Sequence, residues 1–153
     1  MSEVNIHATC VAIGTQGILL LGASGAGKST LVLQLIDGGA RLVADDRTIL
    51  TVKNGVLSAS APAAIRGLME IRGLGIVKLP VRASVRIALV AKLGRKGARL
   101  PQPLLWHPPA PLKPATFPPQ ILLDARPASA AARIRAALAA HRAGTFRDTF
   151  NQG

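Results

Sequence analysis

The stretch that most constrains the fold of this chain is GASGAGKST, at residues 22–30. It matches the pattern G-x-x-x-x-G-K-[ST], follows an apolar run at 18–21 and precedes apolar residues at helical spacing over 28–36. In such a setting the glycines allow a tight turn whose amides cradle phosphate, and the next helix points its positive end at the same place. We therefore predict a strand, a phosphate-binding loop and a helix, which together open an α/β fold.

The same pattern assigns chemistry to individual residues. Lys28 would reach the β- and γ-phosphates of a nucleotide, and the hydroxyl of Ser29 would ligate Mg²⁺. Nucleotide binding is therefore the first functional prediction. The candidate nucleotide-binding residues are Gly22, Ala23, Ser24, Gly25, Ala26, Gly27, Lys28, Ser29 and Thr30.

Length and composition favour a single domain with an aliphatic core. We expect the 153 residues to form one domain, with a flexible tail from about residue 145. The chain is 49% hydrophobic but only 3% aromatic, so Leu, Ile, Val and Ala must fill its core. No apolar run approaches the ~20 residues that span a bilayer. The single cysteine, Cys10, has no partner for an internal disulfide. These features predict a cytoplasmic protein without a membrane segment.

The net charge of +12 would attract a polyanion or an acidic protein. Binding to nucleic acid is not favoured, because the basic residues are spread along the chain and few aromatic side chains are available for base stacking.

The rest of the sequence predicts a mixture of strands and helices. Strands are expected at 4–13, 41–44, 48–52, 56–60, 81–91 and 121–123, and a helix is expected at 129–141 with Ser129 as its N-cap. A turn is expected at 15–17, and Asn54-Gly55 predicts a hairpin. The glycine-rich stretch 65–75 favours no regular element. Eight prolines between residues 100 and 120 predict loop or extended chain.

Two adjacent carboxylates, Asp45 and Asp46, follow the strand predicted at 41–44. If that strand ends beside the phosphate loop, the pair could serve as a base and as a metal ligand in phosphate transfer. Neighbouring side chains of an extended segment point to opposite faces, so the two should not share one role. The alternative is a solvated turn, because Asp is common in turns.

Other candidates carry less weight when each is taken alone. His7 lies in the first predicted strand, where a lone histidine is more often structural than catalytic. Glu70 and Arg72, with glycines following, would contact a metal or a phosphate, or would form a surface ion pair. Arg99 could clamp a phosphate, as could several other arginines.

In combination these segments resemble a known family. HATCVAI at 7–13, GILLLGASGAGKST at 17–30, RLVADD at 41–46 and MEIRGLGIV at 69–77 are similar, in order and spacing, to the catalytic domain of bacterial HPr kinase/phosphorylase. The resemblance is strong over 7–77 and weak over 101–153. It implies a single-domain P-loop kinase fold of the type shared with phosphoenolpyruvate carboxykinase.

The resemblance implies an activity as well as a fold. Members of the family use ATP and Mg²⁺ to phosphorylate a serine of HPr, a small phosphocarrier protein of the phosphotransferase system. Many members also reverse this reaction by phosphorolysis. The resemblance further implies a homo-oligomer, a hexamer, and the basic charge of this chain would suit an acidic HPr-like partner.

The resemblance also implies roles for the candidate residues. Asp46 is the expected general base that takes the serine proton, and Asp45 supports the metal or the geometry, although these two roles could be exchanged. Lys28 binds phosphate, Glu70 is a Mg²⁺ ligand and His7 is the active-site histidine. The catalytic set is His7, Lys28, Asp45, Asp46, Arg72 from the signature and Arg99 as a match to a later arginine, and the metal set is Ser29, Asp45 and Glu70.

The chain departs from the longer members of the family in two places. Thr30 stands where they usually carry Glu, and the stretch 111–120 does not reproduce the segment linked to the reverse reaction. We therefore expect weak phosphorolysis. We also expect a short form without their N-terminal domain, similar to short forms from some proteobacteria. Two alternatives stay open: a small-molecule kinase on the same scaffold, and a nucleotide-binding regulatory module without catalysis.

Overall fold

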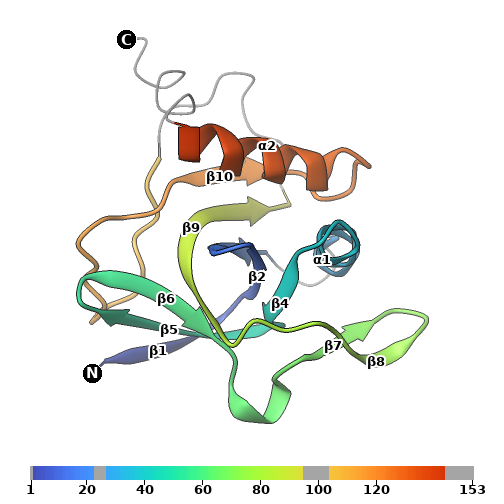
Figure 1. Ribbon diagram of the computed structural model, residues 1–153, viewed down its shortest axis with the longest axis horizontal. Coiled ribbons are helices and arrows are strands. Elements are labelled where there is room, and N and C mark those ends of the chain that lie inside the picture. The colour runs from blue at the N-terminus through green and yellow to red at the C-terminus, as the bar shows by residue number, and fades with distance from the viewer. Residues whose placement is uncertain (1, 23–26, 95–103, 144–153) are drawn as a thin grey trace.

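The computed structural model describes residues 2–22, 27–94 and 104–143. Figure 1 shows a curled sheet, the helices that pack on it and a small separate hairpin. The main sheet has eight strands, seven of them in the order β1 (Glu3–His7), β5 (Arg47–Lys53), β6 (Val56–Ser60), β9 (Ser84–Leu93), β3 (Gln16–Leu21), β2 (Thr9–Ile13) and β4 (Arg41–Ala44), with β10 (Gln120–Leu123) paired to β9. The helices are α1 (Lys28–Asp37) and α2 (Ala130–Ala143), and the hairpin consists of β7 (Leu68–Ile71) and β8 (Gly75–Lys78).

The strand and the helix predicted on either side of the loop are confirmed. β3 is buried along most of its length, as expected for a strand that is covered on both faces. α1 begins at Lys28 and buries Leu31, Val32 and Leu35 against the sheet. β4 then runs in the direction of β3, with β2 between them and antiparallel to both. The carboxyl ends of β3 and β4 therefore lie at the same edge of the sheet.

The segment predicted as one strand at 4–13 consists of two strands, so that prediction is wrong. The break falls at Ala8, whose backbone N–H donates to the carbonyl of Asp46 at 3.0 Å. Before the break β1 pairs with β5, and after it β2 pairs with β3 and β4. The break therefore brings the end of β1 and the start of β2 against the acidic pair.

The turn predicted at 15–17 is also placed wrongly. The turn is formed by Gly14 and Thr15, and Gly17 lies inside β3. A Cβ at Gly17 would lie only 2.8 Å from the carbonyl oxygen of Arg86. This glycine therefore permits the close approach of β9 and does not form a turn.

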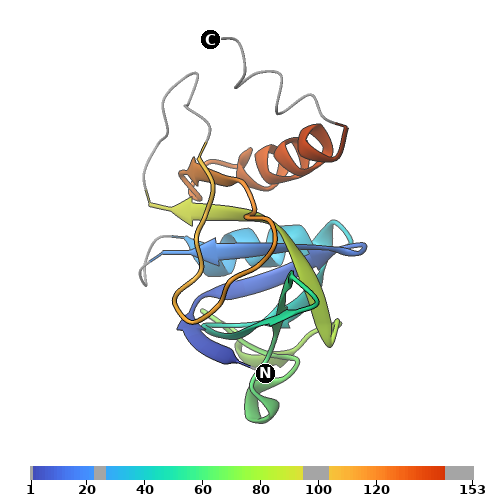
Figure 2. The same cartoon turned by 90° about the vertical axis from the view of Figure 1, so that its left-hand side faces the viewer.

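β9 is long and bends strongly, as Figure 1 shows, and it connects the two halves of the sheet. Its first residues, through Arg86, pair with β6, and its last residues, from Val90, pair in parallel with β10. One face of the sheet packs against α1 and α2. Figure 2 shows the segment 104–119 running across the other face, where Leu112 is buried. Aliphatic side chains fill both layers, as the composition predicts.

The β5–β6 and β7–β8 hairpins can be compared with the turns that the sequence predicts. The β5–β6 hairpin is closed by Asn54 and Gly55, with φ of 54° and 78°, as the Asn-Gly signal predicts. The stretch 65–75, for which the sequence favours no regular element, contains the end of the 3-10 helix η1 (Ala63–Ile65) and most of the β7–β8 hairpin. Gly73 and Gly75 have positive φ, 87° and 91°, so they shape the end of this hairpin without interrupting its strands.

The strand and helix predicted near the C-terminus are confirmed as β10 and α2. Ser129 precedes α2 at the position predicted for its N-cap, and its hydroxyl accepts a hydrogen bond from the side chain of Arg133 (Nε, 3.1 Å), not from a backbone N–H of the helix. Arg135 connects the two helices, because its Nη2 donates to the carbonyl of Leu35 near the end of α1 at 2.7 Å. Within the described ranges, no helix has both the length and the apolar character needed to cross a membrane.

Candidate active site

The two ends of the candidate phosphate loop lie where β3 stops and α1 starts. Gly27 precedes the helix with φ of 86°, a left-handed conformation that suits glycine. Lys28 Nζ donates to the carbonyl of Gly22 at 3.2 Å, so the lysine reaches back across the mouth of the loop. Four of the predicted nucleotide-binding residues lie outside the described part of the chain, namely Ala23, Ser24, Gly25 and Ala26.

The first turn of α1 presents polar groups to solvent. Ser29 and Thr30 are exposed there. No acidic residue lies in this turn, so its free backbone N–H groups and the positive end of the helix dipole are not neutralised locally. This end of α1 is therefore suited to bind an anion.

The acidic pair sits in the short link between β4 and β5, and a buried threonine holds it in place. Asp46 has a φ of 67°, which is uncommon outside glycine and which Asp tolerates better than most residues. Its backbone N–H donates to Thr9 Oγ1 at 3.0 Å, and Thr9 Oγ1 donates to Asp45 Oδ1 at 3.2 Å. Thr9 is fully buried. One hydroxyl therefore fixes both the backbone of Asp46 and the carboxylate of Asp45.

The Asp46 carboxylate is exposed and is contacted by a histidine. His7 Nε2 lies 2.6 Å from Asp46 Oδ1, and the two side chains are 46% and 63% exposed. The end of β1 and the β4–β5 link supply these two groups, which are far apart in the sequence. The structure thus joins two residues that the sequence singles out separately, and it leaves the carboxylate accessible to a substrate.

Asp45 lies in a different environment from its neighbour. Its pKa is raised above the ordinary value, mainly because the half-buried carboxylate is desolvated and also because Asp46 is negative. The Thr9 hydroxyl, a hydrogen bond from the Glu70 backbone amide and the positive charge of Lys28 act in the opposite direction. Asp45 therefore interacts with both the phosphate-loop helix and the β7–β8 hairpin, which separates its role from that of Asp46.

Glu70 and Arg72 lie in the β7–β8 hairpin, but in different places. Glu70 lines a cavity of about 240 Å³ that is also lined by Asp45 and Asp46. Arg72 lies in the exposed turn that joins the two strands. Both residues are described, and no ion pair joins them, so the alternative of a Glu70–Arg72 surface pair does not hold.

The donor set suits a cation that completes its coordination with substrate oxygens. Within the described ranges, no group of three or more His, Cys, Asp or Glu side chains is arranged to hold a metal alone. Mg²⁺ is commonly bound by one or two carboxylates together with phosphates and water. Asp45, Glu70 and the Ser29 hydroxyl are donors of the required chemistry.

The structure adds residues that the sequence reasoning missed. Thr9 carries no signal of its own, because it lies in a strand of buried residues. The link between β10 and α2 lies against the loop, since a Cβ on Gly27 would be 3.4 Å from Ala125 Cβ and 3.6 Å from Arg126 Cγ. Arg126 Nε and Nη2 donate to the two oxygens of Asp124, at 3.0 and 3.2 Å. Arg126 is one of 19 Lys and Arg residues, so nothing in the sequence distinguishes it.

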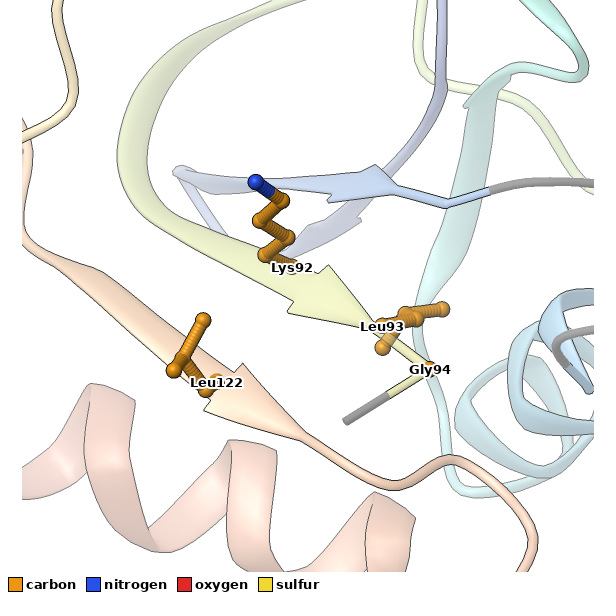
Figure 3. A pocket seen from close by; sticks show the side chains of 4 residues that line it. All are labelled: Lys92, Leu93, Gly94 and Leu122. Atoms are coloured by element: carbon orange, nitrogen blue, oxygen red, sulfur yellow. The ribbon is translucent and has the colours of Figure 1, made fainter. Parts of the chain in front are cut away.

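A larger cavity of about 580 Å³ opens at the ends of β9 and β10. The described residues that line it are Lys92, Leu93, Gly94 and Leu122, shown in Figure 3. Lys92 pairs with Leu21, the last residue of β3. This cavity therefore lies beside the strand that leads into the phosphate loop. Arg99, the remaining catalytic candidate, lies outside the described residues.

The fold and the site together define a mixed α/β domain in which a candidate phosphate-binding loop stands beside a histidine-linked acidic pair. A comparison with protein-family models matches residues 1–94 to the HPr Serine kinase C-terminal domain. The chain therefore belongs to the family of HPr serine kinase C-terminal domains, which confirms the resemblance seen in the sequence.

Named relatives agree with this assignment. The chain is 42% identical over 99 residues to the HPr kinase/phosphorylase of Thermoanaerobacter sp. (strain X514), covering 60% of this chain and 32% of the relative. It is 43% identical over 96 residues to that of Geobacillus sp. (strain WCH70), covering 58% and 31%. The chain thus spans about a third of the length of these relatives.

A solved structure supports the fold over nearly the whole chain. The HPr(Ser) kinase/phosphatase from Coxiella burnetii matches with a TM-score of 0.77 and 25% identity, covering 98% of this chain and 99% of that one. The predicted mixed α/β domain is confirmed by this similarity.

Proposed function

We propose that this chain is an ATP- and Mg²⁺-dependent kinase that phosphorylates a serine of HPr. The observation that carries the proposal is the exposed carboxylate of Asp46, held 2.6 Å from His7 Nε2 at the edge of the sheet where the phosphate loop begins. A carboxylate that is both fixed and accessible is what the deprotonation of an acceptor hydroxyl requires.

The phosphate loop is the proposed site for the ATP phosphates. Lys28 already points across the mouth of the loop toward Gly22, so its ammonium would exchange this neutral partner for phosphate oxygens. The backbone N–H groups at the start of α1 would add to the binding. The cavity beside β9 and β10 has room for a further part of the nucleotide.

Ser29, Asp45 and Glu70 are the residues proposed to hold Mg²⁺. When bound, the ion would neutralise charge that develops on the transferred phosphate. The raised pKa of Asp45 supports this role, because a carboxylate that is poorly solvated and close to another negative charge gains from a nearby cation.

The transfer step assigns one task to each remaining residue. The serine oxygen attacks the γ-phosphorus, the bond from that phosphorus to the β,γ-bridging oxygen breaks, and ADP leaves. The serine proton passes to Asp46, and His7 keeps the carboxylate in place through its hydrogen bond. Arg72 and Arg99 are proposed to contact the phosphate groups, because a guanidinium group can clamp phosphate oxygens.

The acceptor is proposed from the names of the relatives, which are HPr kinase/phosphorylases. The net charge of +12 favours an acidic partner. We also propose that the protein is cytoplasmic and that it forms a hexameric homo-oligomer. Light scattering on the purified protein would measure the oligomeric state.

The direct test is to incubate the purified chain with Mg-ATP and HPr and to locate the added phosphate by mass spectrometry. We expect a single phosphoserine on HPr. Label that appears on a metabolite and never on protein would identify a small-molecule kinase instead. Nucleotide binding without transfer to any acceptor would leave only a regulatory module.

A further inference from the structure

The β7–β8 hairpin carries apolar side chains on a face where a sheet is usually polar. Leu68 pairs with Lys78 and Glu70 pairs with Ile76, so these four side chains share one face, and the alternate residues pack toward the core. Ile76 is 74% exposed, and Leu74 in the adjoining turn is 70% exposed. Exposed apolar residues that gather beside a polar site mark an interaction surface.

This face of the hairpin borders the candidate base. The cavity of about 240 Å³ that contains the acidic pair is also lined by four apolar residues, Ile65, Leu68, Met69 and Ile76. A group that enters the cavity to reach Asp46 would therefore contact apolar side chains at the same time. Figure 1 shows the hairpin projecting from the main sheet, and the exposed Leu68, Leu74 and Ile76 are accessible to a large partner.

The charges around the cavity indicate what kind of group would enter. Three carboxylates line it, those of Asp45, Asp46 and Glu70, against one cation, Arg47. With Mg²⁺ held by Asp45 and Glu70 as proposed, these charges largely cancel, so the cavity suits a neutral group such as a serine hydroxyl. Three cations that do not line the cavity are exposed on the hairpin or just before it: Arg66, Arg72 and Lys78. The pattern is complementary to a surface that is neutral and apolar at its centre and acidic at its periphery.

We propose that Ile65, Leu68, Leu74 and Ile76 form the docking surface for the acceptor protein. The acceptor would place apolar side chains beside its serine onto this surface and would present acidic side chains to the surrounding cations. This inference rests on the proposed function, because it takes the acceptor to be a protein with a serine that reaches Asp46.

The test compares Ile76→Ser and Leu74→Ser with a matched control, Val56→Ser, which changes a valine that is 41% exposed on the β5–β6 hairpin. We expect KM for HPr to rise by roughly tenfold in each hairpin variant, since an apolar side chain would no longer be buried on binding. The kcat at saturating HPr and the affinity for a fluorescent ADP analogue should stay at the wild-type level. The control should leave all three quantities unchanged.

Steady-state kinetics and calorimetric titration of HPr into each variant together distinguish failure of the docking surface from failure of the proposed kinase function. If the wild type phosphorylates HPr but neither hairpin variant changes KM, the docking surface is wrong and the kinase assignment stands. If the hairpin variants change only the oligomeric state, the docking proposal is also wrong, because this face of the hairpin would then join copies of this chain. If HPr binds and Ile76→Ser weakens binding but no phosphate moves, docking stands and the proposed function fails. Absence of both binding and transfer contradicts both.

Discussion

At the scale of single residues, the acidic pair depends on a buried hydroxyl that has no chemistry of its own. Thr9 accepts from the backbone of Asp46 and donates to the carboxylate of Asp45, while Asp46 keeps a left-handed φ of 67°. Uncommon backbone conformations of this kind persist where surrounding contacts enforce them, and they gather at functional sites. We therefore regard Thr9 as a positioning residue for the proposed base.

The substitution Thr9→Val keeps the shape of this side chain and removes both hydrogen bonds. We expect kcat for transfer to HPr to fall by roughly ten- to a hundredfold, because small displacements of a catalytic group are costly. Stability should fall by about 1–3 kcal/mol, since the Asp46 amide loses its acceptor. Steady-state kinetics and urea unfolding measure the two effects.

Thr9→Ser is the control for this substitution, because it restores the hydroxyl without the methyl group. Near wild-type kcat in Thr9→Ser alongside a loss in Thr9→Val would assign the effect to the hydrogen bonds. Equal losses in both variants would mean that only packing matters.

The environment of Asp45 predicts a conflict between stability and function. Its pKa is higher in the folded protein than in the unfolded chain, because burial disfavours the charged form. The stability that this group contributes is therefore fully present below its unfolded pKa, near ~4, and is lost as pH rises through the folded pKa. At neutral pH the burial of this carboxyl group should therefore oppose folding.

We therefore expect Asp45→Asn to raise the melting temperature of the metal-free protein at pH 7 and to lower phosphate transfer. Thermal unfolding between pH 5 and pH 8 in a chelating buffer measures the first effect. Asp37→Asn, at the exposed end of α1, is the control and should change little. A lower melting temperature for Asp45→Asn than for the wild type would contradict the interpretation.

At the scale of secondary-structure elements, α2 supports the helix that follows the phosphate loop. Arg135 Nη2 donates to the Leu35 carbonyl, one of the last in α1. Arg135→Met should lower the free energy of unfolding by about 1–2 kcal/mol, because the hydrogen bond from a charged donor is lost. Arg133→Met is the matched control, since the Arg133 side chain donates to Ser129, next to its own helix. Equal destabilisation of the two variants in urea titrations would refute a specific link between the helices.

Elements defined by short-range signals could be predicted from the sequence. The helix after Gly27 and the hairpin at Asn54-Gly55 follow from residues adjacent in the chain. The break at Ala8 could not be predicted, because it depends on the carbonyl of Asp46, which is distant in the sequence. Gly17 misled the turn prediction for the same reason, since the strand that needs the space lies near Arg86.

The residues of the candidate site also divide into those that a sequence pattern predicts and those that only long-range packing brings to the site. Lys28 and Asp46 carry recognisable patterns, whereas His7 is a weak candidate alone and takes its role from the family resemblance. Thr9 and Arg126 had no pattern, because their positions beside the site arise from strand pairing and from the packing of the β10–α2 link against Gly27. Sequence therefore identified the groups proposed to do chemistry better than the groups that hold them.

At the scale of the whole molecule, the family match is uneven along the chain. The family model covers residues 1–94, which include the loop, the acidic pair and the signature hairpin, and it does not extend over the later segments. Because the stretch 111–120 also departs from the family pattern, we expect slow phosphorolysis compared with forward transfer. Incubation of serine-phosphorylated HPr with inorganic phosphate, with release of pyrophosphate as the readout, measures it. Release as fast as forward transfer in the same preparation would disprove this expectation.

The measurement that tests the account most directly is phosphate transfer to HPr by Asp46→Asn, made alongside the wild type and Asp45→Asn. We predict that Asp46→Asn lowers kcat by roughly 10²–10⁴, the range expected for loss of a general base, while its affinity for a fluorescent ADP analogue is unchanged. Transfer at the wild-type rate by Asp46→Asn would contradict the assignment of Asp46 as the base.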